Sequence, residues 1–502
     1  MQCLGPKPTS EQVLRANAST VAWGYFWKHR EPQLYVRLLV QSGETFTIEM
    51  ASHHNGDMYD WMIKGDPALE DIFRFDYKTQ TISMRGRSGV SDGAHVMTGP
   101  VYICGAEPGD TLKIEILDMK PRKNPVTGKS YAANGIADWG WQKRIVGNRH
   151  VDSTFIYEII MDADGYGMWA EPRLYFKWKD EAGKPLVKVP CWPTNGTLLG
   201  AHNKSMNWSN PFPGMYTVTG YNYTCVNGSV TLGDVGAIVP HPLPTDDYSV
   251  SGKWRLPISP HIGTLGLAPD VEDTPQQANQ PFALRTPEPG GNLDHKRLSM
   301  GAEFSCLWKW RVACSAVANA EYSGTALESN FNARLRVTVL KANDSTISPL
   351  YKNLITPLLE NSNEWCFHGF TVNDYLHDPQ TATGQVGSWN TLLPALSTNT
   401  YQANHGDVSG HVLQLMNNTA VVATSGLMKL GFTRDQASSI LTFACDWEVT
   451  QVVNINMGNH MCCLKYILPV AEGQGSTFVP SVFPGSSRPL KMSNNKFFQP
   501  YR

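Results

Sequence analysis

Apolar and polar residues alternate with a period of two in the N-terminal part of the chain, and this pattern predicts β-strands. The segments that show it are YVRLLVQ (35–41), ETFTIEM (44–50), VYIC (101–104) and TLKIEIL (111–117). Glu-Pro-Gly-Asp at 107–110 has the composition of a tight turn, so we expect a β-hairpin there. Its inward faces carry Val101 and Ile103 on one strand and Leu112, Ile114 and Ile116 on the other.

The C-terminal part follows a helical period instead. Apolar positions recur at helical spacing over 408–422, and we expect Gly426 to end this helix. Thr433 and Gln436 form a capping box that opens a second helix, and VTQVVNIN (449–456) is expected to be a strand. Another alternating segment, FNARLRVTVL, occupies 331–340. The helical positions are Val408, Val412, Leu415, Met416, Thr419 and Val422.

These patterns divide the chain into six parts. Between about 120 and 255 the residues are rich in Trp, Tyr, Asn and Gly with little helical period, which predicts an irregular β insertion. The expected parts are an N-terminal extension (1–30), a β module with site loops (31–120), the insertion (121–258), a second β module (259–345), a smaller α/β part (346–475) and a tail (476–502). The fold class is therefore β-rich mixed α+β.

Composition narrows the class of partner. The 42 Lys+Arg residues nearly balance the 44 Asp+Glu residues, so no strong field draws nucleic acid or an anionic membrane. The aromatic fraction of 10% favours a packed globule, and 43 glycines with 33 prolines favour short strands. No apolar run is long enough to span a bilayer, and the first residues lack a signal-peptide pattern. With ten cysteines but no CxxC, we expect reduced thiols and a cytoplasmic location.

Two polar loops between the N-terminal strands hold the candidate chemistry. His53, His54 and Asp57 have metal-ligand character, although adjacent histidines on a strand point to opposite faces and one of them at most serves. Asp92 and His95 are spaced as a carboxylate that orients an imidazole, or as two metal ligands. On the residues alone, a hydrogen-bonded loop histidine is the better explanation of the first group, and an Asx-turn beside a surface histidine is the better explanation of the second.

Three further features carry weaker signals. Asn292-Leu-Asp294 follows two glycines and suits a turn that aims a carboxylate into a cleft. Cys314-Ser315 lacks a glycine elbow and a partner histidine, so it is better explained as a small buried thiol than as a nucleophile. The 15 tryptophans offer sugar-stacking surfaces, although scattered tryptophans are usually core residues.

Four stretches, in chain order, resemble the acetamidase/formamidase family. They are HVMTGPVYICGAEPGD (95–110), PHIGTLGLAP (260–269), PGGNLD (289–294) and EYSGTALE (321–328). HHNGDMYDWMIKGDPALEDIF (53–73) further resembles the longer eukaryotic branch of that family. The resemblance covers roughly residues 30 to 470 and is weakest in the middle.

The resemblance implies a β-rich fold with sandwich-like modules and a homo-oligomeric hydrolase of short aliphatic amides. A metal-bound hydroxide suits that reaction, because an unactivated amide needs a strong nucleophile and a stabilised oxyanion. The residues implied for catalysis are Glu321, Asp92 and His95; for substrate binding, Asn292, Asp294, Gly263 and Thr264; and for a divalent metal such as zinc, His54, Asp57 and Glu321.

One family segment is disrupted. Members carry G-D-x-H-A-x-Q-G-D-G-E-x-x-G-T-A-x-E, and counting back from the shared Gly-Thr-Ala places Glu321 at the first E. Val312 and Cys314 stand where the family has Asp and His, and the usual lead-in strand survives only as Phe304-Ser305. We therefore expect zinc binding to be weakened or absent, because zinc normally takes three protein ligands plus water.

The sequence leaves three functional hypotheses. The first is a cytoplasmic hydrolase that acts on the C–N bond of short linear amides and whose activity is reduced. The second is a catalytically inactive scaffold or binding protein of the same fold. The third is a carbohydrate-binding protein, and the Thr-Gly-Pro to Gly-Asp match at 98–110 argues against it.

Overall fold

The structure is a computed structural model of the 502-residue chain. It describes residues 10–24, 38–51, 62–73, 92–136, 153–177, 246–267, 290–307, 312–315, 323–370, 408–451 and 458–467. At 22–24, 92–95, 307, 312–315, 408–412, 414 and 466 the description covers the backbone alone.

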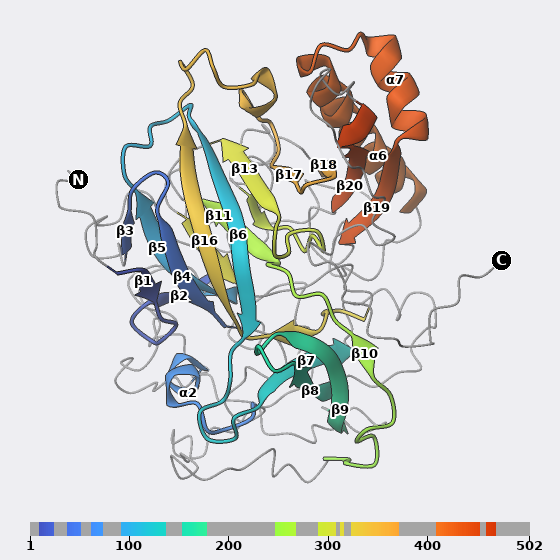
Figure 1. Ribbon diagram of the computed structural model, residues 1–502. Coiled ribbons are helices and arrows are strands. Elements are labelled where there is room, and N and C mark those ends of the chain that lie inside the picture. The colour runs from blue at the N-terminus through green and yellow to red at the C-terminus, as the bar shows by residue number, and fades with distance from the viewer. Residues whose placement is uncertain are drawn as a thin grey trace, which may run out of the picture.

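A nine-stranded sheet forms the centre of the molecule (Figure 1). Its strand order is β1-β4-β16-β6-β13-β17-β18-β20-β19. The alternating segment FNARLRVTVL forms β16, whose apolar residues face the core and whose arginines do not. The bounds are β1 Gln12–Leu14, β4 Thr45–Met50, β16 Phe331–Leu340, β6 Thr111–Pro121, β13 Glu303–Leu307, β17 Leu358–Glu360, β18 Glu364–Phe370, β20 Gly458–Leu464 and β19 Cys445–Gln451.

A six-stranded sheet packs against the central one. Its order is β12-β11-β14-β5-β2, with β3 pairing in parallel with β5. One apolar cluster contains Ile103 and Leu265 of this sheet together with Ile114 and Leu335 of the central sheet, so the two form a sandwich around a shared core. The bounds are β12 Gly290–Asn292, β11 Thr264–Leu267, β14 Val312–Ser315, β5 Asp92–Ile103, β2 Val21–Gly24 and β3 Leu38–Val40.

The expected hairpin at 101–117 is wrong. Val101, Ile103, Leu112, Ile114 and Ile116 are all buried, as the alternation predicted. However, β5 pairs with strands of the six-stranded sheet and β6 with β13 and β16 of the central sheet. The two strands face each other across the core instead of lying side by side, because alternation specifies which face is buried but not which strand is the neighbour.

A five-stranded sheet lies beyond one end of the sandwich (Figure 1). β7, β8 and β9 form an antiparallel meander within the part that the sequence predicted to be an irregular insertion. β15 is an edge strand of this sheet, and its first residue, Glu328, is the last residue of the family segment EYSGTALE. The bounds are β10 Leu256–Pro257, β9 Gly167–Lys177, β8 Ser153–Met161, β7 Ser130–Ile136 and β15 Glu328–Ser329.

Helices are few in the described residues, and two of them gather at the C-terminal corner of the central sheet (Figure 1). α6 packs on β18 and β20, and α7 packs on α6. No described helix is both long and apolar enough to cross a membrane. The bounds are α2 Pro67–Phe73, α6 Val408–Lys429 and α7 Arg434–Phe443, with 3₁₀ turns η3 Pro349–Tyr351 and η7 Lys465–Ile467.

One predicted helix end is confirmed and another is wrong. Thr433 and Gln436 form the expected capping box at the start of α7. Gly426 does not end α6, which continues to Lys429. A Cβ at Gly426 would lie 2.1 Å from Cε1 of Phe367, so the glycine is there to let the helix approach β18 closely.

The cysteines are not all reduced, contrary to expectation. Cys366 on β18 and Cys462 on β20 are direct cross-strand partners joined in a disulfide, and Cys445 on β19 is bonded to Cys463 on β20. The partners of the first disulfide are 96 residues apart in sequence, and only the strand register brings them together. Cys306 is a free thiol buried in the core.

Candidate functional site

Four predicted substrate-binding residues lie together at the paired ends of β11 and β12. Thr264 and Asn292 are cross-strand partners, and the Thr264 hydroxyl donates a hydrogen bond to Asn292 Oδ1 over 2.8 Å. The Gly263 carbonyl accepts a hydrogen bond of 2.9 Å from the backbone N–H of Asp294. Asp294 is fully buried and has a left-handed backbone with φ of 51°. This turn therefore holds a carboxylate and an amide side by side below the surface.

The start of β5 lies at the same end of the six-stranded sheet. Asp92 and His95 are the first and fourth residues of this strand instead of loop residues, and their side chains lie outside the description. β14 lies between β11 and β5: Ser315 of β14 is opposite Thr264 of β11, and Cys314 is opposite Thr98 of β5. β5 is thus three strand spacings from β12, on the order of 14 Å in a flat sheet. Among the described residues, the buried Thr98 hydroxyl of β5 has no hydrogen-bond partner.

The predicted metal ligands lie outside the described residues. This applies to His54 and Asp57, and to Glu321, which was also predicted to be catalytic. The description resumes at Met62 after the first loop and at Ser323 after the disrupted segment. The convergence predicted for His95, Glu321 and the Asp57 loop therefore stays a prediction.

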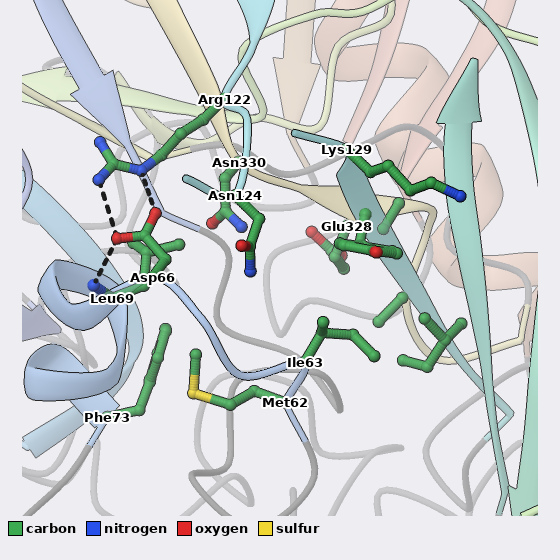
Figure 2. Close-up of a pocket in the computed structure, with 14 residues that line it drawn as sticks. Met62, Ile63, Asp66, Leu69, Phe73, Arg122, Asn124, Lys129, Glu328 and Asn330 are labelled. Atoms are coloured by element: carbon green, nitrogen blue, oxygen red, sulfur yellow. Dashed lines mark hydrogen bonds and ion pairs between the residues drawn. The ribbon is translucent and has the colours of Figure 1, made fainter. Parts of the chain in front are cut away.

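A polar cavity lies between α2, the end of β6 and the five-stranded sheet (Figure 2). It measures about 60 Å³, several times the roughly 10–15 Å³ that one water molecule needs on the same measure, so it has room for a molecule of the size of formamide. Its polar lining residues are Asp66, Arg122, Asn124, Lys129, Glu328 and Asn330, and Met62, Leu69 and Phe73 supply an apolar wall.

A partly buried arginine organises this cavity. Arg122 donates to both carboxylate oxygens of Asp66, over 2.8 and 3.2 Å (Figure 2). It also pairs with Glu49. Burial alone would lower the pKa of Arg122, but the hydrogen bonds and charges of Asp66 and Glu49 outweigh it and raise that pKa. The guanidinium therefore stays charged, and it fixes the start of α2 because Asp66 also accepts the Leu69 N–H over 3.4 Å.

The cavity adjoins the predicted site residues on two sides. Val96, the residue after His95, belongs to the same apolar cluster as Met62, Leu69 and Phe73. Glu328, the last residue of EYSGTALE, lines the cavity and is buried, and its Oε1 accepts the Ala326 N–H over 3.3 Å. Met62, which follows the His54–Asp57 loop, and Glu328 of the EYSGTALE segment thus line one cavity, and Val96 of β5 belongs to the apolar cluster beside it.

The sequence patterns did not identify three buried histidines: one follows Asp294, and two lie on β18 and β20. His368 on β18 and His460 on β20 are direct cross-strand partners, and His295 stacks on His460 with ring centroids 3.8 Å apart. Nδ1 of His460 lies 2.8 Å from the Thr450 hydroxyl. Burial lowers the pKa of all three imidazoles, those of His295 and His368 well below the ordinary value, so the group is neutral at neutral pH.

Arg297 connects the turn that carries Asp294 to the C-terminal strands. Its Nη1 donates to Glu364 on β18 and its Nη2 to Glu448 on β19, each over 2.5 Å, and its side chain is 4% exposed. Contacts with His460, Lys296 and Arg297 lower the pKa of Glu448 well below its usual range. The loop that follows β12 is therefore held to the central sheet by buried charge pairs.

No local signal in the sequence marks these residues. Arg122 and Asp66 are 56 positions apart, and Arg297 is 151 positions from Glu448. The string Asp294-His-Lys-Arg297 resembles an exposed charged turn, whereas in the structure Lys296 alone of the four is substantially exposed. Strand register creates the cluster, and single-sequence patterns do not give register.

The sheets, the turn at Asp294 and the cavity define a β-rich α+β protein with buried polar groups at one end of its sandwich. Residues 29–163 match the model of the Acetamidase/Formamidase family. The resemblance to this family is thereby confirmed over the segment that holds β3 to β8, the Asp57 loop and the Asp92–His95 pair.

The relatives are distant. A provisionally named formamidase of Schizosaccharomyces pombe is 29% identical over 120 residues, which cover 24% of this chain and a quarter (25%) of that protein. An acetamidase from Bacillus halodurans is 15% identical, with 90% of this chain and 98% of that chain covered and a TM-score of 0.47. An acetamidase from Yersinia enterocolitica is 12% identical, with 93% of this chain and 95% of that chain covered and a TM-score of 0.49.

Proposed function

We propose that the chain is a hydrolase that cleaves the C–N bond of short linear amides, such as formamide and acetamide, to a carboxylate and ammonia. The observation that carries this proposal is the family match over residues 29–163. Cytoplasmic location and homo-oligomeric assembly are parts of the same proposal.

The chain's own residues offer the contacts that an amide requires. An amide presents one carbonyl acceptor and one NH₂ donor, and the side chains at the ends of β11 and β12 are complementary to both. The Thr264 hydroxyl fixes Oδ1 of Asn292, which sets the plane of that side chain. Asp294 accepts from an NH₂ group, and Glu321 accepts a proton from the attacking water in the proposed reaction.

Zinc would supply a hydroxide nucleophile and polarise the amide carbonyl in this reaction. The donor set of this chain does not fit the family's ion, because Val312 and Cys314 occupy the Asp and His positions of the family segment. No step is therefore assigned to a metal. With neutral water as the nucleophile and Glu321 as the base, we expect the chain to hydrolyse amides several powers of ten more slowly than an intact family site.

The test is ammonia release by the purified full chain with formamide and with acetamide. We expect slow release that is proportional to enzyme concentration and is lost in Glu321→Gln. Asn292→Ala should raise KM more than it lowers kcat, because that residue is placed in substrate binding. Release that is unchanged in both variants would contradict the proposed site.

The second candidate function is a catalytically inactive scaffold or binding protein of the same fold, which the loss of Asp and His at Val312 and Cys314 favours. It predicts that acetamide binds to the chain in calorimetry or ligand-observed NMR while no ammonia appears over days. Detectable turnover that depends on Glu321 would exclude it.

A further inference from the structure

One face of the β18–β20 pair carries three side chains that metals bind. Glu364 and Cys366 are two positions apart on β18, so their side chains lie on the same face of the strand. Cys462 is the direct cross-strand partner of Cys366. A carboxylate oxygen and the two sulfurs all lie within 4.8 Å of one another. All three residues are buried, each 1% exposed. In the described part of the chain no other group of such side chains is as close.

The two sulfurs are joined in the disulfide, so this structure shows the oxidised state of the group. We propose that reduction of the Cys366–Cys462 disulfide creates a binding site for one zinc-class divalent cation, with Cys366, Cys462 and Glu364 as its ligands. A dithiol reductant supplies two electrons and two protons and is itself oxidised to a disulfide. A phosphine supplies the two electrons and becomes a phosphine oxide, and water supplies its oxygen and the two protons. In either case the S–S bond becomes two thiols. Zinc then replaces the two thiol protons, which are released to solvent.

The surroundings of Glu364 support this ligand set. Its Oε2 accepts from Arg297 Nη1 over 2.5 Å and from Asn361 Nδ2 over 3.2 Å, and these two bonds hold the carboxylate in place. Partners of this kind orient carboxylate ligands in zinc sites. Thiolates and a carboxylate are ligands that zinc accepts, with a water in the fourth position.

The charges of the reduced site also balance. Two thiolates, Glu364 and Glu448 carry four negative charges, and Arg297, Lys296 and the divalent cation carry four positive ones, because Arg297 bridges the two carboxylates and Lys296 pairs with Glu448. A buried site with no net charge avoids most of the cost that an unpaired buried charge incurs. Without the cation, two adjacent thiolates beside a carboxylate repel one another, so the metal-free reduced site keeps its protons. Neither Asp57 nor His54 of the proposed amide site takes part, so this inference does not depend on amide hydrolysis.

The sheet contains a matched control. Cys445 and Cys463 form a second cross-strand disulfide on β19 and β20, and Cys463 faces the cluster under α6 and α7 instead. Within the described residues, no third ligand-type atom lies as close to this pair. Reduction of this disulfide should therefore create two thiols without a zinc site.

The experiment compares the double variants Cys366→Ser/Cys462→Ser and Cys445→Ser/Cys463→Ser of the full chain. Each is reduced with a phosphine, desalted without oxygen and titrated with Cd²⁺, whose thiolate charge-transfer absorption reports sulfur ligation. Zinc affinity is measured by competition with a chromogenic chelator. We expect one equivalent of strong binding in reduced Cys445→Ser/Cys463→Ser, and none at this site in the other variant or in the oxidised chain. Glu364→Gln should weaken zinc binding by at least about tenfold.

A second measurement uses the unmodified chain and does not depend on how the variants fold. The reduced protein is alkylated with and without zinc, and mass spectrometry follows each cysteine. We expect zinc to slow the alkylation of Cys366 and Cys462 at least about tenfold and to leave Cys445 and Cys463 unchanged. Equal cadmium absorption in the two double variants, or equal protection of the two cysteine pairs, would overturn the proposal.

Discussion

The N-terminal cavity and the C-terminal face of the central sheet are both built around an arginine between two carboxylates, partly buried in the first and fully buried in the second. Arg122 joins Asp66 and Glu49, and Arg297 joins Glu364 and Glu448. The first cluster lies within the segment that matches the family, next to motifs that a reader of the sequence can identify. The second lies outside that segment, where the pairing of β18, β20 and β19 brings its two carboxylates to the loop that carries Arg297. Neither arginine has a local sequence signal of its own, because the partners of each are far apart in the chain.

The largest effect should come from restoring the family segment. Replacing the residues between Ala302 and Glu321 with the full Gly-Asp-x-His family segment should raise formamide hydrolysis by several powers of ten, because it returns a metal-activated nucleophile and part of the oxyanion stabilisation. Ammonia release from the replaced and unmodified chains measures this.

The point variant Val312→Asp/Cys314→His serves as the control for that replacement. It should recover little activity, since the shortened lead-in strand misplaces both side chains and an error of about 1 Å can cost about 10²-fold. Robust activity in the unmodified chain would contradict the account of the disrupted segment.

The next largest effect concerns the C-terminal arginine. Arg297→Met leaves the buried Glu364 and the partly buried Glu448 without their shared cation, and should lower the free energy of unfolding by about 3–5 kcal/mol. Urea denaturation followed by circular dichroism measures the loss. Arg255→Met removes a partner of Glu171 at a site that is 55% exposed, and it should cost less than about 1 kcal/mol. An equal decrease in the free energy of unfolding for the two variants would show that burial does not determine the contribution of Arg297 to stability.

A smaller effect should follow the pH. His261 precedes the Gly263 turn, and burial lowers its pKa to about 4, with Lys296 adding to the shift and a bond to the Ser259 carbonyl opposing it. The unfolded chain binds this proton near pH 6.5, so stability is full above that pH and falls as pH drops toward 4. His261 should contribute about 2 kcal/mol to the loss between pH 7 and 5, in addition to the contributions of His295, His368 and His460, whose pKa values are also lowered. His261→Gln should flatten this part of the stability–pH curve; an unchanged slope would assign it to other groups.

Gly426→Ala should cost about 1–3 kcal/mol, even though alanine is the better helix former, because the new methyl group would overlap the buried Phe367 ring. Val421→Ala, at a position on the same helix that is 62% exposed, should change stability by less than about 0.5 kcal/mol. Thermal unfolding of both variants measures the difference, and a stabilised Gly426→Ala would show that the helix can move away from β18.

The smallest effect is local to α7. Thr433→Ala removes the hydroxyl that caps the Gln436 N–H and should cost about 1 kcal/mol. Thr433→Ser keeps the cap and should restore most of the loss. If serine and alanine give the same result in urea denaturation, the capping box does not contribute to stability.

These cases show which parts of the structure a sequence specifies. The cap at Thr433 and the buried faces of β5 and β6 depend on residues within one or two turns or strands, and the sequence predicted them. The partners of β5 and β6, the role of Gly426 and the Cys366–Cys462 bond depend on segments that meet only in the folded chain. The same limit applies to the candidate site: the turn at Asn292–Asp294 was predicted, whereas Arg122, Arg297 and the three histidines were not.

The position of β16 has a consequence for how the protein is made. This strand lies between β4 and β6 and pairs with both, and its Ala333 is opposite Ile48, 285 residues earlier in the chain. A ribosome that adds about 5–20 residues per second needs on the order of tens of seconds to cover that distance. During this time β4 has an open edge where β16 will pair, and such edges are prone to intermolecular pairing. We therefore expect nascent chains truncated before residue 331 to bind chaperones and to aggregate, and chains that extend past β16 to escape both.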